Sequence, residues 1–212
     1  MIIYDFLYKA YKYYNQRLFE NKLPERIVIT IERRSNIKGY FSSSRFSDLR
    51  ENDVLSQITL NPSYFGKGDE KKVLSTLVHE MCHLYMETKG ENGANGYHTK
   101  KWAAVMNECG LKPTNNGKKD GKETGFKMTH LIVKDGKFDR LTKELLDKGV
   151  VFEIRDKESL VKASQSEIKA NKYSRCGKRY KYKCNCSQFW GKNGLRVMCQ
   201  VCKTQFIQEK KE

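Results

Sequence analysis

Apolar side chains recur at helical spacing over two long stretches of the chain's first half. In residues 5–20 they fall three or four positions apart, which predicts an amphipathic helix with Asp5 as an amino-terminal cap and Pro24 beyond its end. In residues 70–88 they surround the helix nearly completely, which is typical of a helix buried at the centre of a domain. The pattern therefore predicts one surface helix and one central helix.

The other periodic segments are shorter. Helical spacing returns from Trp102 to Cys109, where Gly110 is the expected terminator, and again in residues 139–148. Runs of β-branched and aromatic residues predict a small sheet between the first two helices and one strand after the third helix. These runs are residues 27–31, 38–41, 57–60 and 131–133.

Two polar segments interrupt this pattern. Residues 114–125 are rich in glycine, lysine and asparagine and predict a surface loop, to which we assign no chemistry. Residues 155–172 contain no aromatic side chain and predict a linker. We therefore expect an α+β domain over residues 1–154, the linker over 155–172, and a small module over 173–212.

The predicted central helix contains the run His79-Glu80-Met81-Cys82-His83. Residues four apart lie on one face of a helix, so His79 and His83 can each direct a nitrogen at one zinc ion. Glu80, beside them, can reach a water bound to that ion. A buried carboxylate is costly without a compensating cation, which argues against a chance arrangement of exposed side chains. Cys82 is interpreted as a small buried hydrophobe rather than a ligand.

A catalytic zinc usually takes three protein ligands and leaves the fourth position to water. The expected third ligand is His98, because the loop at residues 90–96, rich in glycine and asparagine, can return it to the central helix. His130 lies in a strand-like run, where it is either a rival ligand or an ordinary, partly buried histidine.

The composition indicates an anionic partner. Lysine and arginine outnumber the acidic residues by 41 to 25, for a formal net charge of +16, and such an excess attracts phosphate backbones. No apolar run is long enough to span a bilayer, and Asp5 and Lys9 interrupt the amino-terminal apolar stretch, so we expect neither a membrane span nor a signal peptide. Seven cysteines, an odd number, favour metal ligation in a reducing compartment, hence a cytoplasmic location.

The last forty residues predict a structural zinc site. Cys184 and Cys186, and then Cys199 and Cys202, form two close pairs separated by a short segment, the layout of two knuckles that converge on one tetrahedral zinc. Cys176 is close enough to compete for a position. Four thiolates close the coordination shell, so this zinc would hold together a segment too short to build its own core.

Basic and aromatic side chains alternate just before these cysteines. Such side chains can neutralise phosphates and stack on exposed bases, so nucleic-acid binding is one interpretation, and a solubilising basic tail is the other. The predicted contact residues are Arg175, Lys178, Arg179, Lys181, Tyr182 and Lys183.

Several blocks of the sequence, in this order, resemble those of the SprT-like zinc metalloproteases. The ending also resembles that family's zinc ribbon, except that one residue separates Cys184 from Cys186 where many bacterial relatives have two. The blocks are Asn21-Lys22-Leu23-Pro24, Gly39-Tyr40-Phe41, Ile58-Thr59-Leu60-Asn61-Pro62, the run from Thr76 to Tyr85, and Gly96-Tyr97-His98-Thr99-Lys100-Lys101-Trp102.

The resemblance implies a zincin-like fold in which a small sheet and the central helix precede the ribbon. It implies His79, His83 and His98 as ligands of a catalytic zinc and Glu80 as general base, with a second, structural zinc in the ribbon. It also implies peptide-bond hydrolysis, in the better-studied relatives directed at proteins bound or crosslinked to DNA, which makes DNA, either single-stranded or at junctions, an expected partner.

Two other functions remain open from the sequence. One is a nucleic-acid-binding zinc protein with weak or no protease activity, although a purely structural metal site does not need Glu80. The other is a zinc hydrolase that acts on a small amide. The oligomeric state is not determined by any pattern in the sequence.

Overall fold

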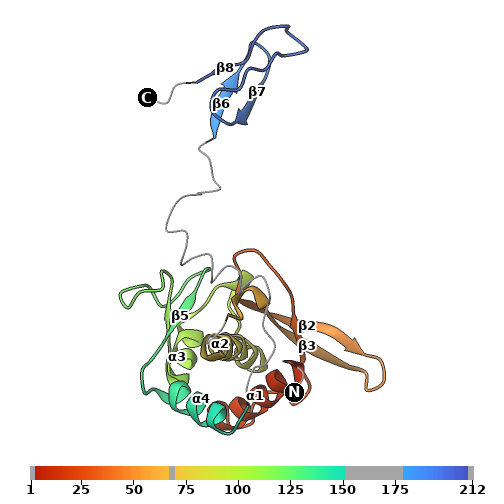
Figure 1. The fold of residues 1–212 in the computed structure, drawn as a ribbon. Coiled ribbons are helices and arrows are strands. Elements are labelled where there is room, and N and C mark those ends of the chain that lie inside the picture. Colours follow the sequence, from red (N-terminus) through yellow and green to blue (C-terminus); the bar gives the residue numbers. More distant parts are fainter. Residues whose placement is uncertain (1–2, 67–69, 151–178, 210–212) are drawn as a thin grey trace. The chain divides into compact units, whose positions relative to one another are not determined.

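The structure is a computed structural model that describes residues 3–66, 70–150 and 179–209 (Figure 1). Contacts divide the chain into two compact units, residues 1–166 and 167–212. The predicted linker at 155–172 and the predicted domain limits lie outside the described residues, as do Arg175, Cys176 and Lys178.

The first unit is a mixed α+β fold built around helix α2, Glu70–Thr88. Figure 1 shows α2 at the centre of this unit, with α1, Ile3–Leu18, α3, Lys100–Cys109, and α4, Lys137–Asp147, packed around it. Strands β2 and β3 also contact α2. Twelve of its side chains are buried, including Leu74, Leu77 and Met81, so the prediction of a buried helix from its apolar circumference is confirmed.

A three-stranded sheet lies beside α2, in the order β1-β3-β2. Strand β1, Val28–Ile31, is parallel to β3, Asp53–Leu60, and β2, Gly39–Asp48, is antiparallel to β3. The β2–β3 hairpin is longer than the sequence predicts, because its outer half is polar and exposed and gives no hydrophobic signal. Strand β2 forms one edge of the sheet.

A second, two-stranded sheet pairs β4, Leu111–Thr114, with β5, Thr129–Ile132, antiparallel. Strand β4 is not predicted from the sequence, because it contains Pro113, which lacks a donor for a sheet ladder. In a two-stranded sheet every strand is an edge, so Pro113 is tolerated opposite His130. Strand β5 begins two residues before the predicted strand, and α4 begins two residues before the predicted helix.

The segment that leads into α3 is fixed at both ends. The 3₁₀ turn Ala94–Gly96 precedes His98, and the Thr99 hydroxyl then caps α3 by accepting a hydrogen bond from the Trp102 amide at 3.2 Å. Gly110 ends the helix in the left-handed conformation, with φ of 85°, as the sequence predicts. His98 is therefore placed immediately before a well-defined helix.

The second unit contains a small three-stranded sheet in the order β7-β6-β8. Its strands are β6, Tyr180–Lys183, β7, Gln188–Gly191, and β8, Ile207–Gln208. Tyr182 is 1% exposed and stacks on Phe189, with ring centroids 5.1 Å apart, and Phe189 packs edge-on against Phe206. These three rings are the apolar centre of the unit.

Among the described residues, no helix has both the length and the apolar character needed to cross a membrane.

Candidate active site

Helix α2 places two histidines and a glutamate on the side that faces a cleft. His79 is 8% exposed and Glu80 is 4% exposed, and His83 follows one turn later on the same face. The cleft has a volume of about 1060 Å³, and its lining includes these three residues together with His98 and the start of β2. The buried motif therefore opens onto a space large enough for a ligand.

His98 joins the two helix histidines. One donor nitrogen from each of His79, His83 and His98 lies within 4.8 Å of the others, and the Nε2 atoms of His83 and His98 are 3.1 Å apart. Two nitrogens that bind one tetrahedral zinc at about 2.05 Å lie roughly 3.3 Å apart. The spacing and the chemistry of this donor set fit zinc.

Burial keeps these imidazoles neutral at pH 7. Desolvation lowers the pKa of His83 to about 3 and lowers the pKa values of His79 and His98 as well. A neutral imidazole has a free lone pair, which a metal ion requires. The three histidines are therefore in the protonation state that binds metal.

Glu80 lies against the main chain of β2. Burial raises the pKa of its carboxyl group to about 8. A Cβ atom added to Gly39 would lie 3.2 Å from Oε1 of Glu80, 2.9 Å from Cγ2 of Thr76 and 2.9 Å from the Thr59 carbonyl oxygen. Gly39 therefore lets the strand approach the carboxylate more closely than any other residue type would.

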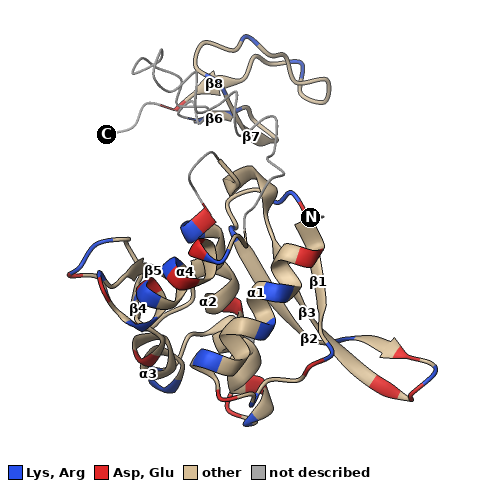
Figure 2. Cartoon of the chain, turned by 60° about the horizontal axis from the view of Figure 1, so that its bottom comes forward, with Lys and Arg blue, Asp and Glu red and all other residues tan. Residues whose placement is uncertain are grey.

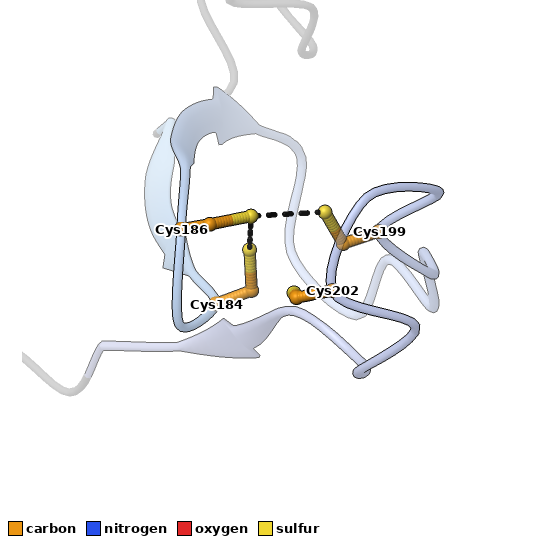
Figure 3. A group of neighbouring side chains, drawn as sticks. All are labelled: Cys184, Cys186, Cys199 and Cys202. Carbon is orange, nitrogen blue, oxygen red and sulfur yellow. Dashed lines mark hydrogen bonds between the residues drawn. The ribbon is translucent and has the colours of Figure 1, made fainter.

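The four cysteines near the carboxyl end form a second donor group, within the second unit (Figure 3). The Sγ atom of Cys186 lies 3.8 Å from that of Cys184 and 3.5 Å from that of Cys199, and all four Sγ atoms lie within 4.8 Å of one another. A tetrahedral zinc with bonds of about 2.3 Å separates its sulfurs by roughly 3.8 Å. The cluster therefore fits a zinc ribbon.

Cys184 and Cys186, with one residue between them, lie in a tight turn. The turn that joins β6 to β7 runs from Cys184 to Ser187 and is closed by a hydrogen bond from the Cys184 amide to the Ser187 carbonyl, 2.9 Å long.

The Thr204 hydroxyl lies 3.0 Å from the Cys202 sulfur, and hydrogen bonding to Thr204 lowers the pKa of that thiol to about 6. A low pKa favours the thiolate form that metals bind.

The first unit's sequence and its histidine geometry agree with one family. The model of the SprT-like family matches residues 7–123. The chain belongs to the SprT-like family. Members of this family are generally zinc metallopeptidases. None of the curated proteins matches the chain.

The match to the SprT-like family includes all three clustered histidines and Glu80. It ends before Gly125, before His130 and before the cysteine cluster. The features of this SprT-like chain beyond residue 123 therefore have to be explained from its own structure.

Trp102 packs against all three clustered histidines of the SprT-like site. Its ring centroid lies 5.0 Å from that of His79, 5.2 Å from that of His83 and 4.4 Å from that of His98. In the sequence, Trp102 is predicted as an apolar helix position and ends one of the blocks that resemble the family. Trp102 is 2% exposed, so it is a buried apolar position. Its contacts also restrict the rotation of the three imidazoles.

The loop at residues 114–125, to which we assigned no chemistry, supports the third histidine. Gly125 and His98 exchange two backbone hydrogen bonds, of 2.9 and 3.2 Å, and Nδ1 of His98 also lies 2.9 Å from the Gly125 carbonyl oxygen. Because a carbonyl only accepts, Nδ1 of His98 is the protonated nitrogen and Nε2 has the lone pair. Main-chain contacts of this kind leave no mark in a sequence.

His130 is not part of the group of three donors. Its Nδ1 lies 3.1 Å from Nδ1 of His79, and its Nε2 lies 2.8 Å from Oγ of Ser75. Both of its ring nitrogens are therefore engaged with side chains of α2. It contacts a predicted ligand rather than replacing one.

Two tyrosines that line the cleft differ in availability. The Tyr40 hydroxyl donates to Glu32 at 2.6 Å, so its proton is used by that bond. Tyr97 is 39% exposed and packs edge-on against Phe126, with ring centroids 5.1 Å apart.

Cys82 is fully buried with its sulfur 4.0 Å from that of Cys109, and burial raises the pKa of its thiol, as expected for a small hydrophobe.

The predicted nucleic-acid contacts that the structure describes fall on two faces of the ribbon sheet. Lys181 and Lys183 alternate with Tyr182 along β6, and Lys181 pairs with Trp190 on β7. Tyr182 is buried, so its ring is not available for stacking on a base and it leaves the predicted contact set. Trp190 is 58% exposed and has the accessible ring instead.

Proposed function

We propose that this chain is a zinc-dependent endopeptidase with His79, His83 and His98 as the ligands of its catalytic zinc. The observation that supports this most directly is the position of Glu80. It is buried next to His79 of the three-histidine group and lines the same cleft, where its carboxylate can accept the proton of a water and release it again.

Zinc, when bound, supplies the Lewis acidity that activates water and polarises a carbonyl group. Glu80 accepts the proton of the attacking water and then delivers it to the nitrogen of the leaving amine. Trp102 and the Gly125 carbonyl hold the ligand rings in place while this proton moves.

The edge of β2 favours a polypeptide over a small amide as the substrate. Gly39, Tyr40 and Phe41 belong to an edge strand and line the cleft. An edge strand presents unpaired main-chain groups, with which an extended peptide can form hydrogen bonds. A small amide would leave most of this 1060 Å³ cleft unused.

The second unit provides a surface for nucleic acid in this proposal. Its described residues, 179–209, contain six lysines and arginines and a single acidic residue, Glu209 (Figure 2). Lys181, Lys183 and Trp190 share one face of the sheet, which joins phosphate-neutralising charge to a ring that can stack on a base. A zinc in the four-cysteine cluster would stabilise this face. We therefore propose proteins bound or crosslinked to DNA as the substrates.

The test compares the purified protein with its Glu80→Gln variant, which keeps the shape of the side chain and removes its basicity. Each is incubated with a DNA-binding protein and with a protein that does not bind DNA, in the presence and absence of single-stranded DNA. We expect cleavage by the wild type only, increased by DNA for the DNA-binding substrate. Cleavage that DNA does not affect would remove the DNA-directed part of the proposal.

Absence of cleavage by both forms, with zinc bound and DNA affinity measurable, would instead favour the nucleic-acid-binding alternative. Hydrolysis of small amides without cleavage of any protein would favour the small-amide alternative.

A further inference from the structure

His130 and Ser75 form a chain of hydrogen bonds that ends on the His79 ring. Nδ1 of His79 lies 3.1 Å from Nδ1 of His130, Nε2 of His130 lies 2.8 Å from the Ser75 hydroxyl, and that hydroxyl donates to the Lys72 carbonyl at 2.8 Å. The residues at both ends of this series of hydrogen bonds, His79 and Lys72, belong to α2, while His130 belongs to β5.

The Lys72 carbonyl at the end of this series of hydrogen bonds determines which atom donates in each of them. A carbonyl oxygen only accepts, so the Ser75 hydroxyl uses its hydrogen on Lys72 and offers a lone pair to His130. His130 then places its proton on Nε2, which leaves Nδ1 as an acceptor for the Nδ1–H of His79. A neutral His79 protonated on Nδ1 has its lone pair on Nε2.

We propose that His130 is a positioning residue that, together with Ser75, fixes the His79 ring with Nε2 as its metal-binding nitrogen. The proposal rests on the function proposed above. Histidines that bind metal ions commonly donate their second N–H to a partner, which sets both the tautomer and the orientation of the ring. Here the partner is a second histidine, itself anchored to the helix that holds the ligand.

The same short segment supports two of the three ligands. Gly125 accepts from Nδ1 of His98, and five residues later His130 accepts from Nδ1 of His79. Strand β5 is held by its pairing with β4, which follows α3 directly. Residues 125–130 therefore support two of the three proposed ligands, His98 and His79. They lie beyond the residues that the family model matches.

The first measurement is the tautomer of His79 in the full-length wild-type chain, by NMR of protein labelled with ¹⁵N-histidine. We expect Nδ1 of His79 to be the protonated nitrogen before metal is added. A proton on Nε2 would overturn the proposal, and this result does not depend on any variant folding.

The second measurement is metal affinity at the histidine site, followed with Co²⁺. Cobalt bound to histidines lacks the intense near-ultraviolet charge-transfer band of cobalt bound to thiolates, so the two sites are distinguished in one chain. We expect His130→Ala to weaken Co²⁺ binding about 10- to 100-fold, the usual cost of losing an outer partner of a ligand. His130→Asn, whose amide oxygen can accept from His79, should restore most of the affinity.

Ile132→Ala is the matched control, because Ile132 lies two residues along β5 on the same face and packs against the core without joining the chain of hydrogen bonds. We expect it to reduce stability while Co²⁺ affinity at the histidine site stays within about threefold of the wild type. Equal losses in His130→Ala and Ile132→Ala, or none in either, would overturn the positioning role. Failure of the wild type to bind Co²⁺ at its histidines would instead reject the proposed function itself.

Discussion

The main chain of Gly39 passes so close to Glu80 that a single added carbon would lie 3.2 Å from the carboxylate oxygen. At Gly39 the strand contributes no side chain to the contact, so its main chain packs directly against the Thr76 and Glu80 side chains of the helix. The position of the proposed base is thus determined by the packing of β2 on α2, and it is sensitive to one methyl group.

Gly39→Ala tests this dependence. The new methyl group would also lie 2.9 Å from the Thr59 carbonyl oxygen, which belongs to the backbone and cannot move aside easily. We expect the free energy of unfolding to fall by about 1–3 kcal/mol and peptidase activity to be largely lost. Chemical denaturation and cleavage assays measure the two effects.

Gly90→Ala provides the contrast, since Gly90 has φ of 65° but no atom within 4 Å of an added Cβ. It should cost about 1 kcal/mol through backbone strain and leave activity unchanged. Equal activity in both variants would show that β2 does not position Glu80.

Glu80 should make the metal-free protein less stable as the pH rises. Its pKa is about 8 in the folded chain and 4.5 as a reference value, so the folded state binds the extra proton between these limits. Stability is therefore lost as the pH increases from 4.5 through 8, by on the order of 3 kcal/mol. Urea unfolding of the chelator-treated wild type and Glu80→Gln at pH 5 and pH 8.5 measures the difference.

Glu80→Gln cannot ionise and should lack this contribution, so the gap between the two proteins is expected to widen with pH. A constant gap would mean that the carboxylate is better solvated than its burial indicates.

Asp139 should contribute stability in the opposite direction. This carboxylate is 2% exposed at the start of α4, and its hydrogen bond and ion pair with Lys71 of α2 lower its pKa to about 2, from 3.8. A lowered pKa gives stability that is present above pH 3.8 and lost as the pH falls toward 2. We expect Asp139→Asn to cost roughly 1–2 kcal/mol at pH 7 and progressively less in acid.

Asp147→Asn is the control for Asp139, since it removes one negative charge from the exposed end of the same helix. Its effect on unfolding should stay within about 0.5 kcal/mol at every pH. A similar loss in both variants at pH 7 would assign the effect to the net charge of α4 rather than to the contact with Lys71.

The face of the ribbon sheet that contains Lys181, Lys183 and Trp190 should bind single-stranded oligonucleotides through both charge and stacking. Lys181→Ala removes one cation, so we expect weaker binding and a salt dependence whose slope falls by about 1. Trp190→Ala should weaken binding by about 1–3 kcal/mol, with the slope unchanged, because stacking releases no counterions. Fluorescence anisotropy at several salt concentrations separates the two effects.

Lys9→Ala, which removes one exposed lysine of the first unit, is the matched control and should leave the affinity nearly unchanged. A loss as large as that of Lys181→Ala would indicate attraction by the overall charge of the chain, without a defined face.

The sequence predicts the parts of this structure that depend on local patterns. The buried helix at residues 70–88, the cap and terminator of α3, and the small first sheet all follow from spacing and residue type. The pairing of His79 and His83 follows from helix geometry. Strand β4 was missed because Pro113 conceals it, and the outer half of the β2–β3 hairpin was missed because it buries nothing.

The supports of the site were beyond local patterns for a different reason. The contacts of Gly125 with His98, and of His130 with His79, join residues 27 and 51 positions apart. The carbonyl of Gly125 is chemically the same as any other, and His130 alone suggested a rival ligand. Only the three-dimensional arrangement shows that both serve as hydrogen-bond partners of other histidines.

The three clustered histidines differ in the stiffness of what holds them. His79 and His83 belong to the middle turns of a helix surrounded by packed elements, whose amides should exchange with solvent only when the whole unit opens. His98 instead follows a short 3₁₀ turn outside the helix, and the three hydrogen bonds that hold it beside its contact with Trp102 go to one loop residue, Gly125. We therefore expect an ion bound at this proposed site to detach from His98 first. The rate of metal exchange would then follow the opening of the loop at residues 114–125 rather than the unfolding of the helix.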